Sequence, residues 1–143
     1  MKKISFIILT AILLIPTMAK AQNNNGYITA EPDPEVFLTV TEDPEFPGGE
    51  EALIAFIREH VQYPEEAKKA NITGTVVVTF IIEKDGSLSN MKILRDIGGG
   101  CGTEAVRVLR QMPKWKPGKI RKSGQADLKV VRCQFSLPIV FEL

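Results

Sequence analysis

The sequence predicts an α+β domain, a two-layer sandwich in which helices cover one face of a three-stranded, mainly antiparallel sheet. Two alternating apolar segments, 75–83 and 88–95, are joined by a turn and predict a β-hairpin. An amphipathic helix over 103–111 follows, and a long alternating segment over 127–141 predicts a third strand. The helix before it makes a right-handed crossover, so the third strand runs parallel to the second. The first strand then fits between them, which gives the strand order 2-1-3.

The first 21 residues of the 143-residue chain have the form of a secretory signal peptide. A basic start precedes an apolar run from Ile4 to Ile15, and Ala19 and Ala21 place small residues just before Gln22. This pattern predicts cleavage between Ala21 and Gln22. The apolar run is shorter than the roughly 20 residues of a membrane-spanning helix. Retention of residues 1–21 as an N-terminal membrane anchor is the alternative.

Residues 22–46 form an extended lead-in rich in proline and acidic residues, and the domain proper is expected over 47–143. Residues that precede proline are driven out of the helical region, so the lead-in cannot hold a long helix. Val36, Leu38 and Val40 alternate with their neighbours, and this predicts at most one short edge strand.

Two helices are expected before the hairpin. Glu50 and Glu51 lie in the first turn of a helix that follows Pro47-Gly48-Gly49, where carboxylates meet the positive end of the helix dipole. Apolar residues at helical spacing give this helix one buried stripe: Leu53, Phe56, Ile57 and Val61. Pro64 suits the first position of a second, short helix because its missing N–H is not needed there.

In the hairpin, one face of the first strand is apolar: Val76, Val78, Phe80 and Ile82. After the hairpin, the glycines between 98 and 102 let the backbone leave the sheet, and Thr103 is expected to cap the next helix. Residues 119–125 are expected to form a basic, polar loop. The strand over 127–141 carries Pro138 on its polar face, and the missing N–H of this residue predicts a sheet edge or a bulge.

The chain offers no constellation of catalytic residues or metal ligands. Its single histidine, His60, is expected at a helix C-terminus, where it interacts favourably with the dipole. Signature motifs of zinc sites, hydrolases and nucleotide-binding loops are missing. We therefore expect no enzyme, no catalytic residue, no metal and no cofactor. The net charge of only +1 argues against nucleic-acid binding.

Three interpretations of the two cysteines, Cys101 and Cys133, stay open. Export to an oxidising compartment makes a disulfide between them a candidate. Unpaired structural thiols are the second interpretation, because Cys133 falls on the apolar face of its strand. In the third, Cys101 precedes a helix N-terminus, has a lowered pKa and serves a thiol-dependent periplasmic enzyme.

Several short motifs follow one another along the last two thirds of the chain: Glu45–Glu50, Tyr63–Ala67, Gly74–Val78, Lys84–Gly86, Glu104–Val108, Met112–Gly118 and Leu137–Phe141. In this order they resemble the C-terminal domain of TonB, the periplasmic energy transducer, over about residues 45–143. The resemblance implies a module that captures the TonB box, a short extended segment of outer-membrane TonB-dependent receptors, by adding it to a sheet edge. It also implies a periplasmic location and a link to energy-coupled import of siderophores, vitamins or glycans.

By this resemblance, the last strand supplies the edge that receives the peptide. The residues expected to contact the partner peptide are Gln62, Tyr63, Pro64, Leu128, Val130, Arg132 and Gln134. Strand addition also agrees with general physics, because main-chain pairing supplies affinity and alternate side chains supply selectivity.

The N-terminus departs from the family pattern because the long proline-rich spacer is missing. Residues 22–46 extend about 90 Å at most, and the apolar run carries no polar residue for coupling to a motor. The main hypothesis is a soluble or weakly tethered module that binds receptors without transducing energy itself. A short, anchored transducer that meets inner-membrane motor proteins is the alternative. A long edge strand is also compatible with a strand-exchanged homodimer.

The two hypotheses for the N-terminus differ in the mass of the exported protein. We expect mass spectrometry to find a mature chain that begins at Gln22, because the small-x-small pattern ends at Ala21. An intact mass that still includes residues 1–21 would contradict cleavage and favour the anchor.

Overall fold

The structure, a computed structural model, describes residues 36–143. The predictions for the signal peptide, its cleavage at Ala21–Gln22 and the first part of the lead-in lie outside these residues. The described elements follow the order β1 (Val36–Phe37), α1 (Gly49–His60), α2 (Glu65–Lys69), β2 (Gly74–Ile82), β3 (Leu88–Arg95), α3 (Cys101–Arg110), β4 (Lys119–Arg121), β5 (Leu128–Val130) and β6 (Arg132–Phe141).

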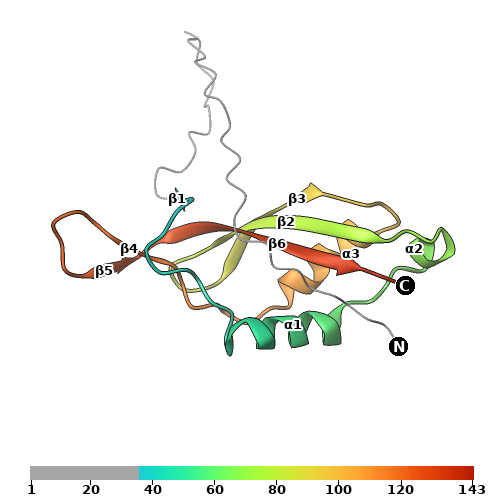
Figure 1. The fold of residues 1–143 in the computed structure, drawn as a ribbon, viewed down its shortest axis with the longest axis horizontal. Helices are drawn as coiled ribbons and strands as arrows, with labels where there is room; N and C mark the ends of the chain where they lie inside the picture. Colours follow the sequence, from blue (N-terminus) through green and yellow to red (C-terminus); the bar gives the residue numbers. More distant parts are fainter. Residues whose placement is uncertain (1–35) are drawn as a thin grey trace, which may run out of the picture.

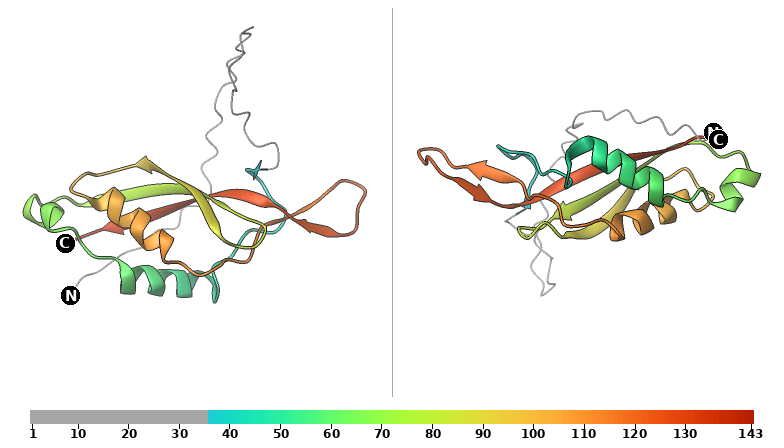
Figure 2. Two further views of the ribbon diagram at one scale, coloured as in Figure 1. Left: turned by 180° about the vertical axis from the view of Figure 1, so that it is seen from behind. Right: turned by 90° about the horizontal axis from the view of Figure 1, so that it is seen from below.

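The main sheet has the strand order β1-β6-β2-β3. β2 pairs antiparallel with both β3 and β6, so the α+β class and the predicted 2-1-3 order of the three long strands are confirmed. The predicted count of three strands is wrong, because the short β1 adds a fourth strand beside β6. The register between β2 and β6 is unbroken from Gly74 opposite Phe141 to Ile82 opposite Cys133. α1 and α3 cover the same face of this sheet, as the view from below in Figure 2 shows.

Alternation along β2 and β6 builds the core between sheet and helices. Every second residue of each strand points toward α1 and α3, and burial of a large aliphatic side chain stabilises the fold by about 1.5–3 kcal/mol. The fully buried set includes Val76, Val78, Phe80, Ile82 and Ile139 from the strands, and Ile57, Val108 and Leu109 from the helices. The predicted apolar faces of these elements are therefore confirmed.

An aromatic cluster closes the end of the core near β4. Trp115 lies 5.6 Å from Phe46, 5.8 Å from Phe80 and 5.4 Å from Phe135, measured between ring centroids. Rings at these separations in tilted or edge-to-face geometry attract each other beyond simple area burial. The cluster joins the lead-in, β2 and β6 at one place.

The last strand is not continuous as predicted. It divides at Val131, whose N–H donates to the Gly118 carbonyl at 3.0 Å and whose side chain is buried. Before this point, β5 leaves the main sheet and pairs with β4, with Lys119 opposite Val130 and Arg121 opposite Leu128. The prediction of a loop over 119–125 is therefore wrong for its first three residues, because they form a hairpin with β5. This hairpin projects from the body of the domain (Figure 1).

The second part of the lead-in packs against the domain before Pro47. The N–H groups of Thr41 and Glu42 donate to the Lys119 carbonyl at 2.8 and 2.9 Å, and Glu45 and Lys116 exchange two backbone hydrogen bonds. Phe46 is buried in the aromatic cluster. Further upstream, Val36 and Phe37 form β1, which lies parallel to β6 beside Arg132 and Cys133. The short edge strand expected around Val36–Val40 thus exists but ends at Phe37.

The cap of α3 differs from the prediction. The helix begins at Cys101 rather than after Thr103, with Gly100 at φ 84° as its N-cap. The carboxylate of Asp96 accepts hydrogen bonds from the N–H groups of Ile97, Gly98 and Gly102 at 2.8, 3.1 and 3.1 Å. Asp96, not Thr103, therefore satisfies a free donor of the first turn.

Two glycines with similar backbone angles allow a matched test of the turn between β2 and β3. Gly86 has φ +86° and leaves no room for a side chain, since an added Cβ would lie 1.9 Å from the Trp115 carbonyl oxygen. Gly124 has φ +79° and nothing within 4 Å. We expect Gly124→Ala to lower the free energy of unfolding by about 1 kcal/mol, and Gly86→Ala by roughly 2 kcal/mol more. Urea denaturation measures both, and equal losses would contradict the close approach.

Candidate functional site

Within the described residues, the main sheet has one edge at β3 and another along the outer side of β6. Among the described strands, only β2 pairs with β6 beyond Cys133. The stretch from Gln134 to Phe141 is about 25 Å long at roughly 3.3 Å per residue. An edge of this length presents N–H and C=O groups that can pair with another extended chain.

Pro138 fixes which backbone groups face this open side. It lies opposite Val77 in an unbroken register, so the predicted alternative of a bulge is wrong and the predicted edge position is confirmed for the described strands. A residue without N–H fits an antiparallel ladder only where its backbone groups point away from the neighbouring strand. By alternation, Gln134, Ser136 and Val140 point the same way. The Thr79 hydroxyl donates to the Phe135 carbonyl at 3.1 Å, which places the Phe135 carbonyl on the β2 side as this pattern requires.

The predicted contact residues divide into two groups at opposite ends of β6. Leu128 and Val130 lie on β5, in the projecting hairpin, while Arg132 and Gln134 begin β6. Gln62, Tyr63 and Pro64 lie between α1 and α2, near the other end of the strand, where the rings of Tyr63 and Phe141 are 5.6 Å apart. One extended chain along β6 would span the distance between the two groups.

Arg132 is held on the outer face of the sheet. Its Nε and Nη2 donate to the two carboxylate oxygens of Glu83 at 2.6 and 3.2 Å, and each side chain is about one quarter exposed. A two-point contact of guanidinium and carboxylate fixes the geometry of both groups. Gln134, one position further along this face, is exposed.

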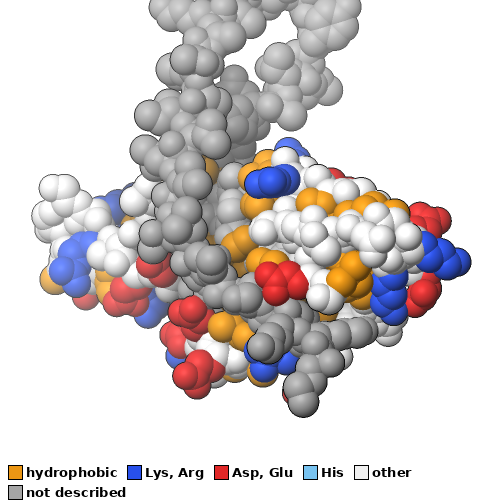
Figure 3. All heavy atoms as spheres, turned by 45° about the vertical axis from the view of Figure 1, so that its right-hand side comes forward, with side chains coloured by type: hydrophobic (Ala, Val, Ile, Leu, Met, Phe, Trp, Pro, Cys, Tyr) orange, Lys and Arg blue, Asp and Glu red, His pale blue; other side chains and the backbone are white. Residues whose placement is uncertain are grey.

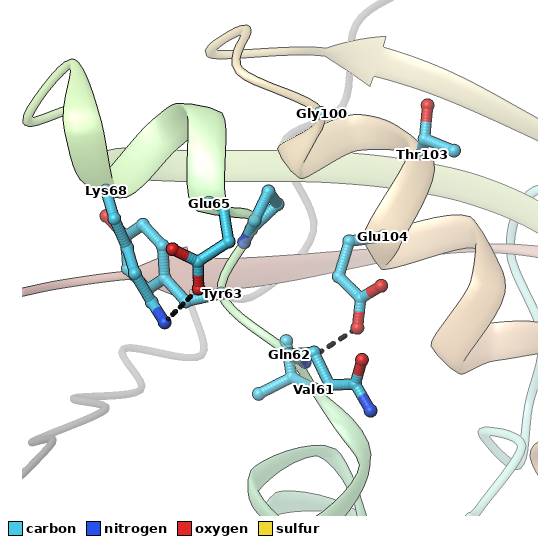
Figure 4. Close-up of a pocket in the computed structure, with 9 residues that line it drawn as sticks. Val61, Gln62, Tyr63, Glu65, Lys68, Gly100, Thr103 and Glu104 are labelled. Carbon is cyan, nitrogen blue, oxygen red and sulfur yellow. Dashed lines mark hydrogen bonds and ion pairs between the residues drawn. The ribbon is translucent and has the colours of Figure 1, made fainter.

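A hollow of about 640 Å³ lies beside the second group of residues (Figure 4). The end of α1, the α1–α2 connection, α2 and the start of α3 surround it. Its lining consists of Val61, Gln62, Tyr63, Pro64, Glu65, Lys68, Gly100, Thr103 and Glu104. At its rim, Lys68 and Glu65 form an ion pair at 2.8 Å.

The α1–α2 connection is attached to α3 by a pair of charged residues that the sequence interpretation missed. The Gln62 N–H donates to Glu104 Oε1 at 2.7 Å, and Arg107 donates two hydrogen bonds to the same carboxylate at 2.8 and 2.6 Å. Arg107 also donates to the His60 carbonyl at 2.6 Å. Three-residue spacing on a helix was the available signal for the Glu104–Arg107 pair, but its contact with residues 60 and 62 depends on tertiary packing.

These contacts shift the acid–base behaviour of the pair. Partial burial alone would raise the pKa of Glu104, but the hydrogen bonds from Arg107 and from the Gln62 N–H outweigh it and hold the pKa below its ordinary value of 4.5. The same contact raises the pKa of Arg107. Tyr63 is fixed in a similar way, since its hydroxyl donates to the Ile72 carbonyl and burial raises its pKa.

The two cysteines are free and buried, so the disulfide, one of the three open interpretations, is not formed in the structure. Val77 lies opposite both Arg95 and Pro138, so the end of β3 that leads to Cys101 is level with the far part of β6. Cys133 lies at the other end of β6, opposite Ile82. Burial, with the neighbouring Asp96 and Glu104 carboxylates, raises the pKa of the Cys101 thiol, which contradicts the lowered pKa that a reactive thiol requires.

The remaining histidine and the acidic residues form no metal-binding cluster in the part of the chain that the structure describes. His60 ends α1, where its Nδ1 lies 2.8 Å from the Phe56 carbonyl and its ring stacks on Phe56 at 3.9 Å. Within residues 36–143, no three His, Cys, Asp or Glu side chains lie close enough together to hold a metal ion. Acidic and basic side chains are interspersed on the visible face in Figure 3.

Comparison with known proteins gives one family. The model of the Gram-negative bacterial TonB protein C-terminal family matches residues 59–143, which is more than half of the chain. Among solved structures, the solution NMR structure of the Helicobacter pylori TonB C-terminal domain (residues 194–285) is similar at 20% identity. That alignment covers 64% of this chain and 90% of the other, with a TM-score of 0.44. A comparison with curated proteins found no match.

Over residues 36–143, no helix is both long enough and apolar enough to cross a membrane.

The Glu104–Arg107 pair predicts a pH-dependent stability. Because the pKa of Glu104 is lowered in the folded state, its contribution is complete above the ordinary value of 4.5 and is lost as the pH falls through the lowered pKa. We expect Glu104→Gln to reduce the free energy of unfolding by about 1–3 kcal/mol at neutral pH, with a smaller difference in acid. Glu50→Gln, an exposed carboxyl in the first turn of α1, is the matched control. A difference between wild type and Glu104→Gln that does not shrink in acid would contradict this account.

Proposed function

The chain belongs to the family of Gram-negative bacterial TonB C-terminal domains, and on that premise we propose that its β6 edge binds an extended receptor peptide by strand addition. Membership of the family implies a role in receptor interaction and energy-coupled import. We assign the TonB box of outer-membrane receptors to the edge between Gln134 and Phe141.

One observation carries this proposal: the stretch from Gln134 to Phe141 pairs with β2 on one side and with no described strand on the other. Main-chain hydrogen bonds to this edge would supply affinity for any extended chain. Selectivity would come from the side chains of the outer face, where Gln134 and Ser136 are exposed. The core-facing residues of β6 are engaged with the helices and give the edge a rigid support.

The α1–α2 connection supports a second contact with the partner. A chain added along β6 ends near Phe141, and Tyr63 packs against that residue. Gln62, Tyr63 and Pro64 line the hollow at this end, and Glu104 holds Gln62 in place by a charge-assisted hydrogen bond. We assign this hollow to side chains of the receptor peptide that extend past the strand.

β1 sets the other limit of the proposed site. It occupies the β6 edge at Arg132 and Cys133, so a visiting chain pairs first with residues beyond them. A longer visitor would displace β1 and reach Val130 and Leu128 on β5. We therefore expect Gln134 and Ser136 to contribute to binding every such peptide, and Leu128 and Val130 only to binding a long one.

The proposed setting is the periplasm, with residues 1–21 as the export signal. There the domain would bind receptors that import siderophores, vitamins or glycans, either beside a full-length transducer or in competition with it. In this proposal the domain acts as a binding module without force transmission of its own.

An NMR titration tests the proposed site. The ¹⁵N-labelled protein, as isolated from the expressing cells, is titrated with a synthetic TonB-box peptide of an outer-membrane receptor. We expect the largest amide shifts at Gln134, Ser136 and Val140, because their N–H groups face the visitor, and smaller shifts at Gln62 and Tyr63. Binding that shifts only β3 amides, at the opposite edge of the sheet, would contradict the assignment, and no shift at all would contradict the function.

A further inference from the structure

We propose that Pro138 makes the β6 edge selective for a foreign strand over a second copy of this chain. This inference rests on the proposed function, because it concerns which partners the same edge accepts. Between Gln134 and Phe141 there is no charged residue, although charged side chains are a common protection of exposed edges.

In the absence of charged residues, Pro138 is the residue in this stretch that limits pairing with another strand. It interrupts neither the register with β2 nor the core, since its neighbours Leu137 and Ile139 are buried in their expected positions. The proline ring instead takes the place of an N–H on the open side, between the outward-facing Ser136 and Val140. The edge therefore offers outward N–H donors at Ser136 and Val140, and none at Pro138 between them.

The consequences differ for the two kinds of partner. When two copies pair edge to edge across a two-fold axis, the outward residues of one β6 lie opposite those of the other. Each copy brings its own Pro138, so the ladder lacks two hydrogen bonds. A foreign strand with a complete set of N–H groups lacks only one. Each missing bond weakens association by roughly 2- to 10-fold, and self-association carries this factor twice.

The self-association of the Pro138→Ala variant tests whether Pro138 weakens pairing between two copies of the chain. Alanine restores the donor and keeps a small side chain, and Pro113→Ala is the matched control because this exposed proline lies outside β6. In sedimentation equilibrium of the full protein, we expect the dimer dissociation constant of Pro138→Ala to fall roughly 4- to 100-fold below that of wild type and control. A folded Pro138→Ala, judged by circular dichroism, with unchanged self-association would overturn the inference.

A double variant tests whether any new dimer uses the β6 edge. Ser136→Pro combined with Pro138→Ala moves the position that lacks an N–H from residue 138 to residue 136. The number of outward donors then equals that of wild type. We expect this double variant to return to the self-association of wild type. A dimer that persists in it, with the fold intact, would place the contact on another surface and overturn the inference.

Peptide binding separates failure of the inference from failure of the proposed function. Isothermal titration with the synthetic TonB-box peptide should show that Pro138→Ala binds roughly 2- to 10-fold more tightly than wild type, a smaller gain than that in self-association. A gain for the peptide as large as that for the dimer would overturn selectivity and leave the function standing. Stronger self-association without peptide binding to either protein would overturn the function and leave the exclusion of a second copy supported.

Discussion

The unbroken antiparallel pairing of β2 with β6 is the constraint on which the rest of the structure depends. It places the apolar residues of both strands on one face, where α1 and α3 cover them. It also leaves the other side of β6 at the margin of the sheet, beside the two residues of β1. The same strand is thus a core element through its side chains and an interaction surface through its backbone. A slip of one residue would bury Gln134 and Ser136 and expose Phe135 and Leu137.

Elements with strong local periodicity could be predicted from the sequence. Period-two alternation identified β2 and β6, helical spacing identified α1 and α3, and the missing donor of Pro138 located the margin of the sheet. The errors arose where distant residues decide the local structure. Val131 divides the last strand because its N–H meets the Gly118 carbonyl, and Lys119–Arg121 is extended because β5 lies beside it.

The same distinction applies to the candidate site. The edge followed from strand order, but the partners of individual side chains did not. Glu104 was not recognised as the acceptor for Gln62, because the two residues are 42 positions apart in the sequence. Asp96 lies only six positions before Gly102, and it was missed because Thr103 was taken as the cap of a helix that in fact begins at Cys101. The separation of Cys101 from Cys133 also depends on the folded sheet: β6 runs along its whole length, so the first residues of β6 lie far from the end of β3. Local patterns identify an element but not which of its ends meets which neighbour.

The orientation of β6 has a mechanical consequence. This strand runs along the longest axis of the molecule (Figure 1). A partner chain held beside it and tugged along that axis would strain all the shared hydrogen bonds at once, in shear. A force perpendicular to that axis would break the same hydrogen bonds one after another from one end. The mechanical resistance of this interface therefore depends on the direction of the applied force as well as on the number of hydrogen bonds.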